Sequence, residues 1–368
     1  MTNNRKRLFM VFGTRPEAIK LAPLIKSIQE DVGFELKICV TAQHRELLDG
    51  VLREFNINPQ FDLSIMQEDQ TLDYITYEVL RTVGELLDLC VPDIVIVQGD
   101  TTTAFASALA AFYRNIPIAH IEAGLRSGNI SAPFPEEFNR RAISAISSYH
   151  FAPTSAAEAT LLSEGICADK IYTVGNTVID SLFMTKEDKI DYKILKFIND
   201  RPFFLVTVHR REHSDKELEE IFEGIKNLLE DNPRICAVYP LHKSPRVIKK
   251  ATEILKDTEN IFLCEPQSVK SFHSLLRKCL FVLTDSGGIQ EEVTFLGKPA
   301  LIARYVTERN EGMESGVLKL VGADGDAIYA AATLLLYDKY EYEKMTRPSL
   351  VYGDGNASRR IVEVLKRV

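Results

Sequence analysis

The stretch that follows a predicted strand at Phe281–Thr284 carries residue types that bind a phosphorylated ligand. Ser286, Gly287 and Gly288 come shortly after the strand, and a helix is predicted over Ile289–Leu296. Glycines let the backbone approach a phosphate, and the first amides of a helix point at it with the positive end of the dipole behind them. The pattern predicts an anion site, although glycines required only for packing would give the same sequence pattern.

Glu292 lies about one helical turn beyond Gly288, on the helix that this turn opens. A carboxylate repels phosphate but suits a pair of vicinal hydroxyls, such as those of a ribose. Phosphate and ribose sites on one helix indicate a nucleotide.

Basic residues stand in a comparable place near the start of the chain. Arg15 follows a predicted strand at Leu8–Phe12, and Pro16 occupies the first position of the next helix. A guanidinium there suits a diphosphate, and Lys20 lies one turn further along. The alternative is a surface arginine whose stem is packed.

Two acidic residues also follow predicted strands. Asp100 comes after the strand at 94–97, where it could cap the next helix or lie at the edge where open α/β sheets place their chemistry. Glu122 ends the strand at 117–121, and a glutamate there is costly to bury unless it has a partner or a function.

The segment Pro133-Phe134-Pro135 leads into a further helix opened by Glu136 and Glu137. Favourable interaction with the helix dipole explains at least one of these glutamates without any function.

Strands and helices alternate in two series along the chain, which predicts an α/β protein with two doubly wound Rossmann-like domains. We expect the first domain to comprise residues 1–174 plus a returning C-terminal helix at about 355–368, and the second to comprise residues 175–354. The carboxyl ends of the two sheets would face a common cleft, with carboxylates on one side and anion-binding groups, including His209, on the other.

The overall composition limits the class of protein. The 368 residues exceed what one core needs, and the net charge of -8 argues against a nucleic-acid surface. The six cysteines form no metal-binding spacing, which indicates a reducing compartment. We find neither a signal peptide nor an apolar run of membrane length and therefore expect a cytoplasmic protein.

Seven motifs occur in one order across nearly the whole chain and resemble the non-hydrolysing bacterial UDP-N-acetylglucosamine 2-epimerase family. They are Gly13-Thr14-Arg15-Pro16-Glu17-Ala18, Gln43-His44-Arg45, Gly99-Asp100-Thr101-Thr102-Thr103, Glu122-Ala123-Gly124-Leu125-Arg126, Pro135-Glu136-Glu137, His209-Arg210-Arg211-Glu212 and Asp285-Ser286-Gly287-Gly288-Ile289-Gln290-Glu291-Glu292. The resemblance implies a GT-B-like fold, a homodimer, and interconversion of UDP-GlcNAc and UDP-ManNAc for surface polysaccharide. It implies no cofactor, no metal, and no nucleic-acid or membrane partner.

The resemblance also implies roles for individual residues. Catalytic roles fall to Asp100, Glu122, Glu136, His209 and Arg15. Substrate-binding roles fall to Arg15, Lys20, Arg140, His209, Phe272, Ser286, Gly287, Gly288, Glu292 and Arg309.

The chemistry explains why such a site needs carboxylates. The C2 proton of the sugar is not acidified by a carbonyl, so a carboxylate alone cannot remove it. Breaking the C1–O bond first gives an oxocarbenium-like centre that acidifies C2, and a 2-acetamidoglucal remains when UDP leaves. Inversion then needs one proton-transfer group on each face, and the sequence leaves open which carboxylate is the base and which is the acid.

The chain departs from the family pattern in places. His213 stands where asparagine is usual, and the run Tyr305–Glu311 differs from the family's. The pattern for a second, activating UDP-GlcNAc is kept at Gln43, Glu136, Arg210 and His242. It is broken at Glu46 and Asp69, two acidic residues that would repel an anionic activator, so we expect weakened activation.

Three other enzymes remain compatible with the sequence: a hydrolysing epimerase that releases ManNAc and UDP, an epimerase of a modified UDP-sugar, and a GT-B glycosyltransferase. A sugar sensor that binds without turnover is a fourth, non-catalytic alternative.

Overall fold

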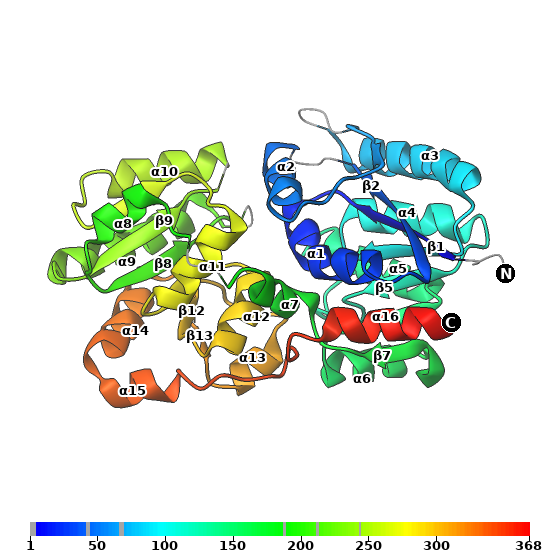
Figure 1. Cartoon of the computed structure of the whole chain (residues 1–368). Helices are drawn as coiled ribbons and strands as arrows, with labels where there is room; N and C mark the ends of the chain where they lie inside the picture. Colours follow the sequence, from blue (N-terminus) through cyan, green and yellow to red (C-terminus); the bar gives the residue numbers. More distant parts are fainter. Residues whose placement is uncertain (1–4, 42–44, 66–69, 187–188, 211–212, 243) are drawn as a thin grey trace. The chain divides into compact units, whose positions relative to one another are not determined.

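The computed structural model describes residues 5–41, 45–65, 70–186, 189–210, 213–242 and 244–368. The chain forms two compact units, Met1–Met184 with Tyr352–Val368, and Thr185–Val351 (Figure 1). Each unit contains a parallel sheet with helices packed against it, which confirms the predicted α/β class. The segment 175–184, assigned to the second domain from the sequence, lies in the first unit.

The first unit contains a seven-stranded sheet in the order β3-β2-β1-β4-β5-β6-β7, and all its strand pairs are parallel. The strands are β1 (Lys6–Phe12), β2 (Phe34–Val40), β3 (Phe61–Asp62), β4 (Ile94–Gln98), β5 (Ile118–Ile121), β6 (Tyr149–Ala152) and β7 (Ile171–Thr173). The edge strand β3 is only two residues long.

Helices of the first unit connect these strands. They are α1 (Arg15–Gln29), α2 (Arg45–Glu54), α3 (Leu72–Cys90), α4 (Thr102–Phe112), α5 (Glu136–Ile146), α6 (Ser155–Ser163), the 3-10 helix η1 (Ala168–Lys170), α7 (Thr177–Met184) and α16 (Ala357–Arg367). The last helix, α16, packs against α1 and α7, so the end of the chain belongs to the first unit.

The second unit contains a six-stranded parallel sheet in the order β10-β9-β8-β11-β12-β13. The strands are β8 (Phe203–Thr207), β9 (Cys236–Pro240), β10 (Ile261–Cys264), β11 (Val282–Thr284), β12 (Ala300–Ile302) and β13 (Leu318–Leu320). The helices are α8 (Tyr192–Ile198), α9 (Asp215–Asp231), α10 (Pro245–Leu255), α11 (Val269–Lys278), α12 (Gly287–Leu296), α13 (Asn310–Glu314), α14 (Gly325–Tyr337) and α15 (Lys339–Lys344).

Both faces of each sheet are covered, which is why the central strands are continuous apolar runs rather than alternating ones. In the second unit, Phe204 and Val206 of β8 point into a core with α9 and α14, whereas Leu205 faces a separate core with α11 and α12. In the first unit, Val95 and Val97 of β4 pack with α3 and α4.

Parallel pairing brings the strand ends together at one edge of each sheet. Gln98 of β4 is paired in register with Ile121 of β5, so Asp100 and Glu122 follow neighbouring strand ends. In the second unit, Thr207 of β8 is paired with Thr284 of β11, so His209 and Asp285 also follow neighbouring strand ends. Within the described ranges, no helix has the length and apolar character needed to span a membrane.

Candidate active site

Glu122 is the most constrained carboxylate of the first unit. It is buried at the end of β5 and adopts a left-handed backbone conformation with φ of 66°. Its Oε2 atom accepts hydrogen bonds from the Gln98 amide at 3.1 Å, from the Asn176 amide at 3.0 Å, and from the Lys20 ammonium. Three donors from separate parts of the chain therefore compensate the burial of this charge.

Lys20, predicted to bind substrate, is itself buried in α1 with its ammonium group on Glu122. Asn176 is held in place by its backbone N–H, which donates to the Tyr352 carbonyl at 2.7 Å. The position of the Glu122 carboxylate is thus set by α1, β4 and the segment before α7.

Asp100 lies at the neighbouring strand end and is partly exposed. Its Oδ2 atom is 2.6 Å from Nη2 of Arg140, and its backbone carbonyl accepts from the Asn139 amide at 2.9 Å. The reading of Asp100 as a helix cap is wrong, because Thr101 caps α4 by accepting from Ala104 N–H at 3.0 Å. The Asp100 side chain is therefore not used as a cap.

The two glutamates that open α5 have different surroundings. Glu137 is fully buried and accepts from Ser127 N–H at 2.9 Å, from Arg140 at 3.2 Å and from Arg141 at 3.1 Å. Its role is structural, since it holds the loop before α5 and the guanidinium that contacts Asp100. Glu136 is half-buried at the first position of the helix.

Arg15 is half-exposed at the first position of α1, where Thr14 and Glu17 form a capping box. The buried Glu17 carboxylate accepts from Gly13 N–H at 3.1 Å, from Thr14 N–H at 2.8 Å and from the Thr101 hydroxyl at 2.8 Å. Burial raises the pKa of Glu17, although these hydrogen bonds oppose the rise. Glu17 thereby joins the loop that carries Arg15 to the loop that carries Asp100.

His120 supports the same edge from inside the sheet. The buried ring contacts the Gly99 carbonyl through Nε2 at 2.8 Å, and burial lowers the pKa of His120 to about 3. A neutral histidine therefore fixes Gly99, whose left-handed φ of 68° turns the chain toward Asp100.

The glycine-containing turn of the second unit is the N-terminus of α12. The helix begins at Gly287, earlier than the predicted start at Ile289, so both glycines lie in its first turn. A Cβ atom on Gly287 would come within 3.1 Å of the Arg309 guanidinium, whereas one on Gly288 would meet nothing within 4 Å. Gly288 therefore leaves open space in the first turn of α12, whereas Gly287 is buried against Arg309 and Glu308.

Asp285 organises the residues beside this helix start. It is buried and accepts from the backbone N–H groups of His209 at 2.7 Å and Arg210 at 2.8 Å. Its carboxylate also lies 3.2 Å from Nδ1 of His209 and 3.3 Å from Nε2 of His213. Burial alone would raise the pKa of Asp285, but electrostatic interaction with His209 and these hydrogen bonds lower it to about 2.

This contact orients His209. Because Nδ1 faces the carboxylate, Nε2 is the nitrogen left to contact a ligand. The ring also stacks on His242, with centroids 5.0 Å apart.

Arg309, predicted to bind substrate, is buried and contacts two carboxylates. Its Nε donates to Glu291 at 3.0 Å and its Nη1 to Glu308 at 2.5 Å. Burial would raise the pKa of Glu308, but Arg309, Arg304 and Arg210 hold it well below its usual range. The Arg309 guanidinium therefore packs against Gly287, on the side where a Cβ atom would lie.

Glu292 is buried on α12, and one of its two carboxylate oxygens contacts a histidine. Its Oε1 atom lies 3.4 Å from Nε2 of His273, while its buried Oε2 atom has no hydrogen-bond partner among the described residues. A buried acceptor without a donor is costly, and a ligand hydroxyl would satisfy it. The partly buried Phe272, on the helix that carries His273, packs against the core beside α12.

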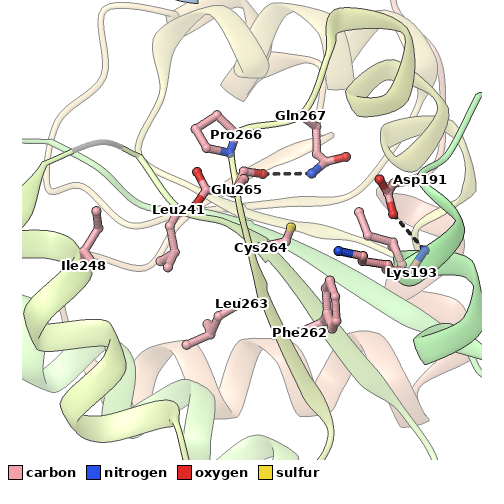
Figure 2. Close-up of a pocket in the computed structure, with 11 residues that line it drawn as sticks. Asp191, Lys193, Leu241, Ile248, Phe262, Leu263, Cys264, Glu265, Pro266 and Gln267 are labelled. Atoms are coloured by element: carbon pink, nitrogen blue, oxygen red, sulfur yellow. Dashed lines mark hydrogen bonds between the residues drawn. The ribbon is translucent and has the colours of Figure 1, made fainter.

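A hollow of about 430 Å³ lies at the carboxyl ends of β9 and β10 in the second unit (Figure 2). Phe262, Cys264 and Gln267 line it, and Gln267 accepts from the Ser271 hydroxyl of α11 at 3.0 Å. One residue that lines the hollow is thus hydrogen-bonded to α11, the helix that carries Phe272.

Several predicted positions cannot be placed. Gln43 and Asp69 lie outside the described residues, as does the side chain of Glu46. Within the described ranges, no group of three or more histidine, cysteine, aspartate or glutamate side chains is arranged to hold a metal ion.

Several residues that hold the predicted site residues in place were not predicted from the sequence. Gln98, Asn176 and Asp285 had no assigned roles, and Glu137 was not separated from Glu136. A usable signal existed for Gln98, because a polar side chain that ends a buried strand needs a partner, as Glu122 does.

The low pKa of Asp285 predicts a pH-dependent contribution to stability. Since the folded-state pKa of about 2 lies below the value of about 3.9 for an exposed aspartate, the ionised group stabilises the fold above about pH 4, and this stabilisation is lost as the pH falls toward 2. We expect Asp285→Asn to lower the free energy of unfolding by roughly 2 kcal/mol at pH 7 and by much less near pH 2.5.

Thermal unfolding followed by circular dichroism across this pH range measures the difference, with Asp257→Asn, at an exposed position of the same unit, as the control. A deficit of Asp285→Asn that stays constant across the range would show that the charge of Asp285 does not stabilise the fold.

Comparison with known proteins gives a consistent result. The profile of the UDP-N-acetylglucosamine 2-epimerase family matches residues 26–366. The UDP-N-acetylglucosamine 2-epimerase of Bacillus subtilis is 48% identical over 359 residues, which cover 98% of this chain and 94% of that protein.

Two solved structures have the same fold. The S. aureus MnaA–UDP co-structure has a TM-score of 0.94 at 45% identity, covering 98% of this chain and 96% of that one. The UDP-GlcNAc 2-epimerase of Neisseria meningitidis, bound to UDP-GlcNAc, has a TM-score of 0.94 at 43% identity, covering 98% of this chain and 100% of that one. With a family profile spanning most of its length and relatives this similar over nearly all of it, the chain belongs to the UDP-N-acetylglucosamine 2-epimerase family.

Proposed function

We propose that this protein interconverts UDP-GlcNAc and UDP-ManNAc by inverting the configuration at C2 of the sugar. Membership of the family supports the proposal, as do the relatives whose structures contain UDP or UDP-GlcNAc. The observation that carries it furthest is the division of chemistry between the units. The first unit has the carboxylates of Asp100 and Glu122 at the ends of β4 and β5. The second unit has the N-terminus of α12, which suits an anion, on the same helix as Glu292, whose buried Oε2 atom has no hydrogen-bond partner among the described residues.

The second unit is suited to bind UDP. The amides at the start of α12 would bind the diphosphate, Nε2 of His209 would stabilise the negative charge of the departing β-phosphate, and Glu292 would accept a ribose hydroxyl. The hollow lined by Phe262, Cys264 and Gln267 has a volume and a mixture of apolar and polar residues that suit the uracil base. Arg15, from the first unit, would add a further charge to the diphosphate.

The reaction begins with cleavage of the C1–O bond, whose electron pair leaves on the UDP oxygen. A carboxylate then takes the proton from C2, and the electrons of that C–H bond form the C1–C2 double bond of a 2-acetamidoglucal. A second acid returns a proton to the opposite face of C2, and the UDP oxygen adds again to C1. Atoms and charges balance without an external oxidant or reductant.

Asp100, Glu122 and Glu136 are the carboxylates that we assign to proton transfer and positioning. Arg140 holds Asp100 in a single orientation, and Glu122 is held by its three donors, so each has the fixed geometry that proton transfer requires. Two groups on opposite faces of C2 suffice for inversion.

We further propose a cytoplasmic homodimer. Aromatic side chains are exposed on neighbouring helices of the first unit, with Tyr77 on α3, Phe112 on α4 and Tyr113 at its end. Exposed apolar groups of this kind gather at interfaces between subunits. The six cysteines are all free thiols, which suits a reducing compartment.

Incubation with UDP-GlcNAc in deuterium oxide tests the reaction. Because C2 loses its proton and regains one from solvent, we expect UDP-ManNAc and recovered UDP-GlcNAc to carry deuterium at C2 with UDP still attached, as seen by NMR. Accumulation of free ManNAc and UDP would indicate a hydrolysing epimerase instead, and UDP-sugars that remain unlabelled would contradict epimerisation at C2.

Substitution of Asp100 tests the division of roles between the units. Asp100→Asn keeps the shape of the side chain but removes its ability to take a proton, so we expect kcat to fall at least a hundredfold while UDP affinity changes little. Steady-state kinetics and calorimetric titration with UDP measure the two effects. Asp88→Asn, at an exposed surface pair with Arg114, is the matched control. Normal turnover by Asp100→Asn would remove Asp100 from the mechanism.

A further inference from the structure

His273 is a buried histidine that the proposed reaction does not use. It lies on α11 with 1% of its surface exposed, between two other buried polar side chains. Its Nε2 atom is 3.4 Å from Oε1 of Glu292, and its Nδ1 atom is 2.6 Å from the Thr185 hydroxyl. Three polar groups thus form a continuous line that ends at the carboxylate assigned to the ribose.

His273 Nε2 makes a close polar contact with Glu292 Oε1 at 3.4 Å, whereas Nδ1 is hydrogen-bonded to the Thr185 hydroxyl. An ionised carboxylate only accepts, so the Nε2 atom that faces Glu292 must carry a hydrogen. In a neutral ring Nδ1 is then the acceptor, and the Thr185 hydroxyl donates to it. Thr185 therefore selects the tautomer that can donate to Glu292.

Thr185 is itself fixed within the second unit, of which it is the first residue. Its backbone carbonyl accepts from Nη2 of Arg277 at 2.6 Å, and Arg277 lies in the last turn of α11, one turn beyond His273. The line from Thr185 to Glu292 is therefore built on α11 and α12.

We infer that His273 and Thr185 are positioning residues that orient Glu292 for recognition of one ribose hydroxyl; the inference rests on the proposed function. By holding Oε1, the His273 ring directs the second oxygen, Oε2, toward the ligand. That oxygen is buried and has no hydrogen-bond partner among the described residues, as expected for an acceptor reserved for a ligand hydroxyl.

A purely structural histidine predicts something different. If His273 only filled space in the core, its loss would weaken binding of every ligand of this site to the same extent. Positioning of Glu292 predicts a loss confined to ligands that carry the hydroxyl in question. The two interpretations are distinguished by comparing the affinities of different ligands, because the stability of the variants would not separate them.

The experiment is calorimetric titration of the full-length protein with UDP, 2′-deoxy-UDP and 3′-deoxy-UDP. The variants are His273→Leu, which removes both ring nitrogens, and Thr185→Val, which removes only the hydroxyl. Thr185→Ser keeps a hydroxyl and is the matched control, and His273→Gln keeps a donor close to the place of Nε2. Circular dichroism confirms that each variant is folded.

We expect UDP to bind about tenfold more weakly to His273→Leu and about three- to fivefold more weakly to Thr185→Val, with Thr185→Ser near wild type and His273→Gln between wild type and His273→Leu. For the deoxy ligand that lacks the hydroxyl bound by Glu292, wild type and variants should bind alike. Equal losses for all three ligands, or no loss for UDP, would overturn the inference while leaving the proposed function intact. A wild-type protein that binds no UDP would overturn the proposed function together with this assignment.

Discussion

A carboxylate at the end of a buried strand must be supplied with hydrogen-bond donors, and the candidate site of the first unit depends on how this is done for Glu122. Lys20, Gln98 and Asn176 converge on one of its oxygens from three separate segments. These contacts tie α1, β4 and the segment before α7 to the end of β5. The elements that carry Arg15 and Asp100 are thus held by the group that needs the most compensation.

The second unit solves a related problem with Asp285, whose carboxylate lies among backbone amides and the rings of His209 and His213. In both units a buried acid orders the loops that follow neighbouring parallel strands. The residues able to meet a ligand, such as Asp100 and His209, are then arranged around these acids. This arrangement suits electrostatic catalysis, where groups must be oriented before the charge develops.

The strand ends of an α/β protein could be predicted from the sequence, because each apolar run ends where polar residues begin. The α/β class follows from the alternation, and apolar runs followed by Arg15, Asp100, Glu122 and His209 indicate the strand ends where the candidate site is placed. The supporting contacts could not be predicted, because Asn176 meets Glu122 across 54 positions of sequence. The wrong reading of Asp100 has a local cause, since Thr101 is an equally good cap and lies one residue closer to the helix.

The central claim is that the bond between C1 and the diphosphate breaks and forms again during epimerisation. The most direct measurement uses UDP-GlcNAc with oxygen-18 in the position that bridges C1 and the β-phosphorus. If the bond breaks and UDP adds again, the label should appear in the non-bridging oxygens of the β-phosphate of recovered UDP-GlcNAc, read by phosphorus NMR. Epimerisation that proceeds to equilibrium with the label still entirely in the bridge would contradict the account.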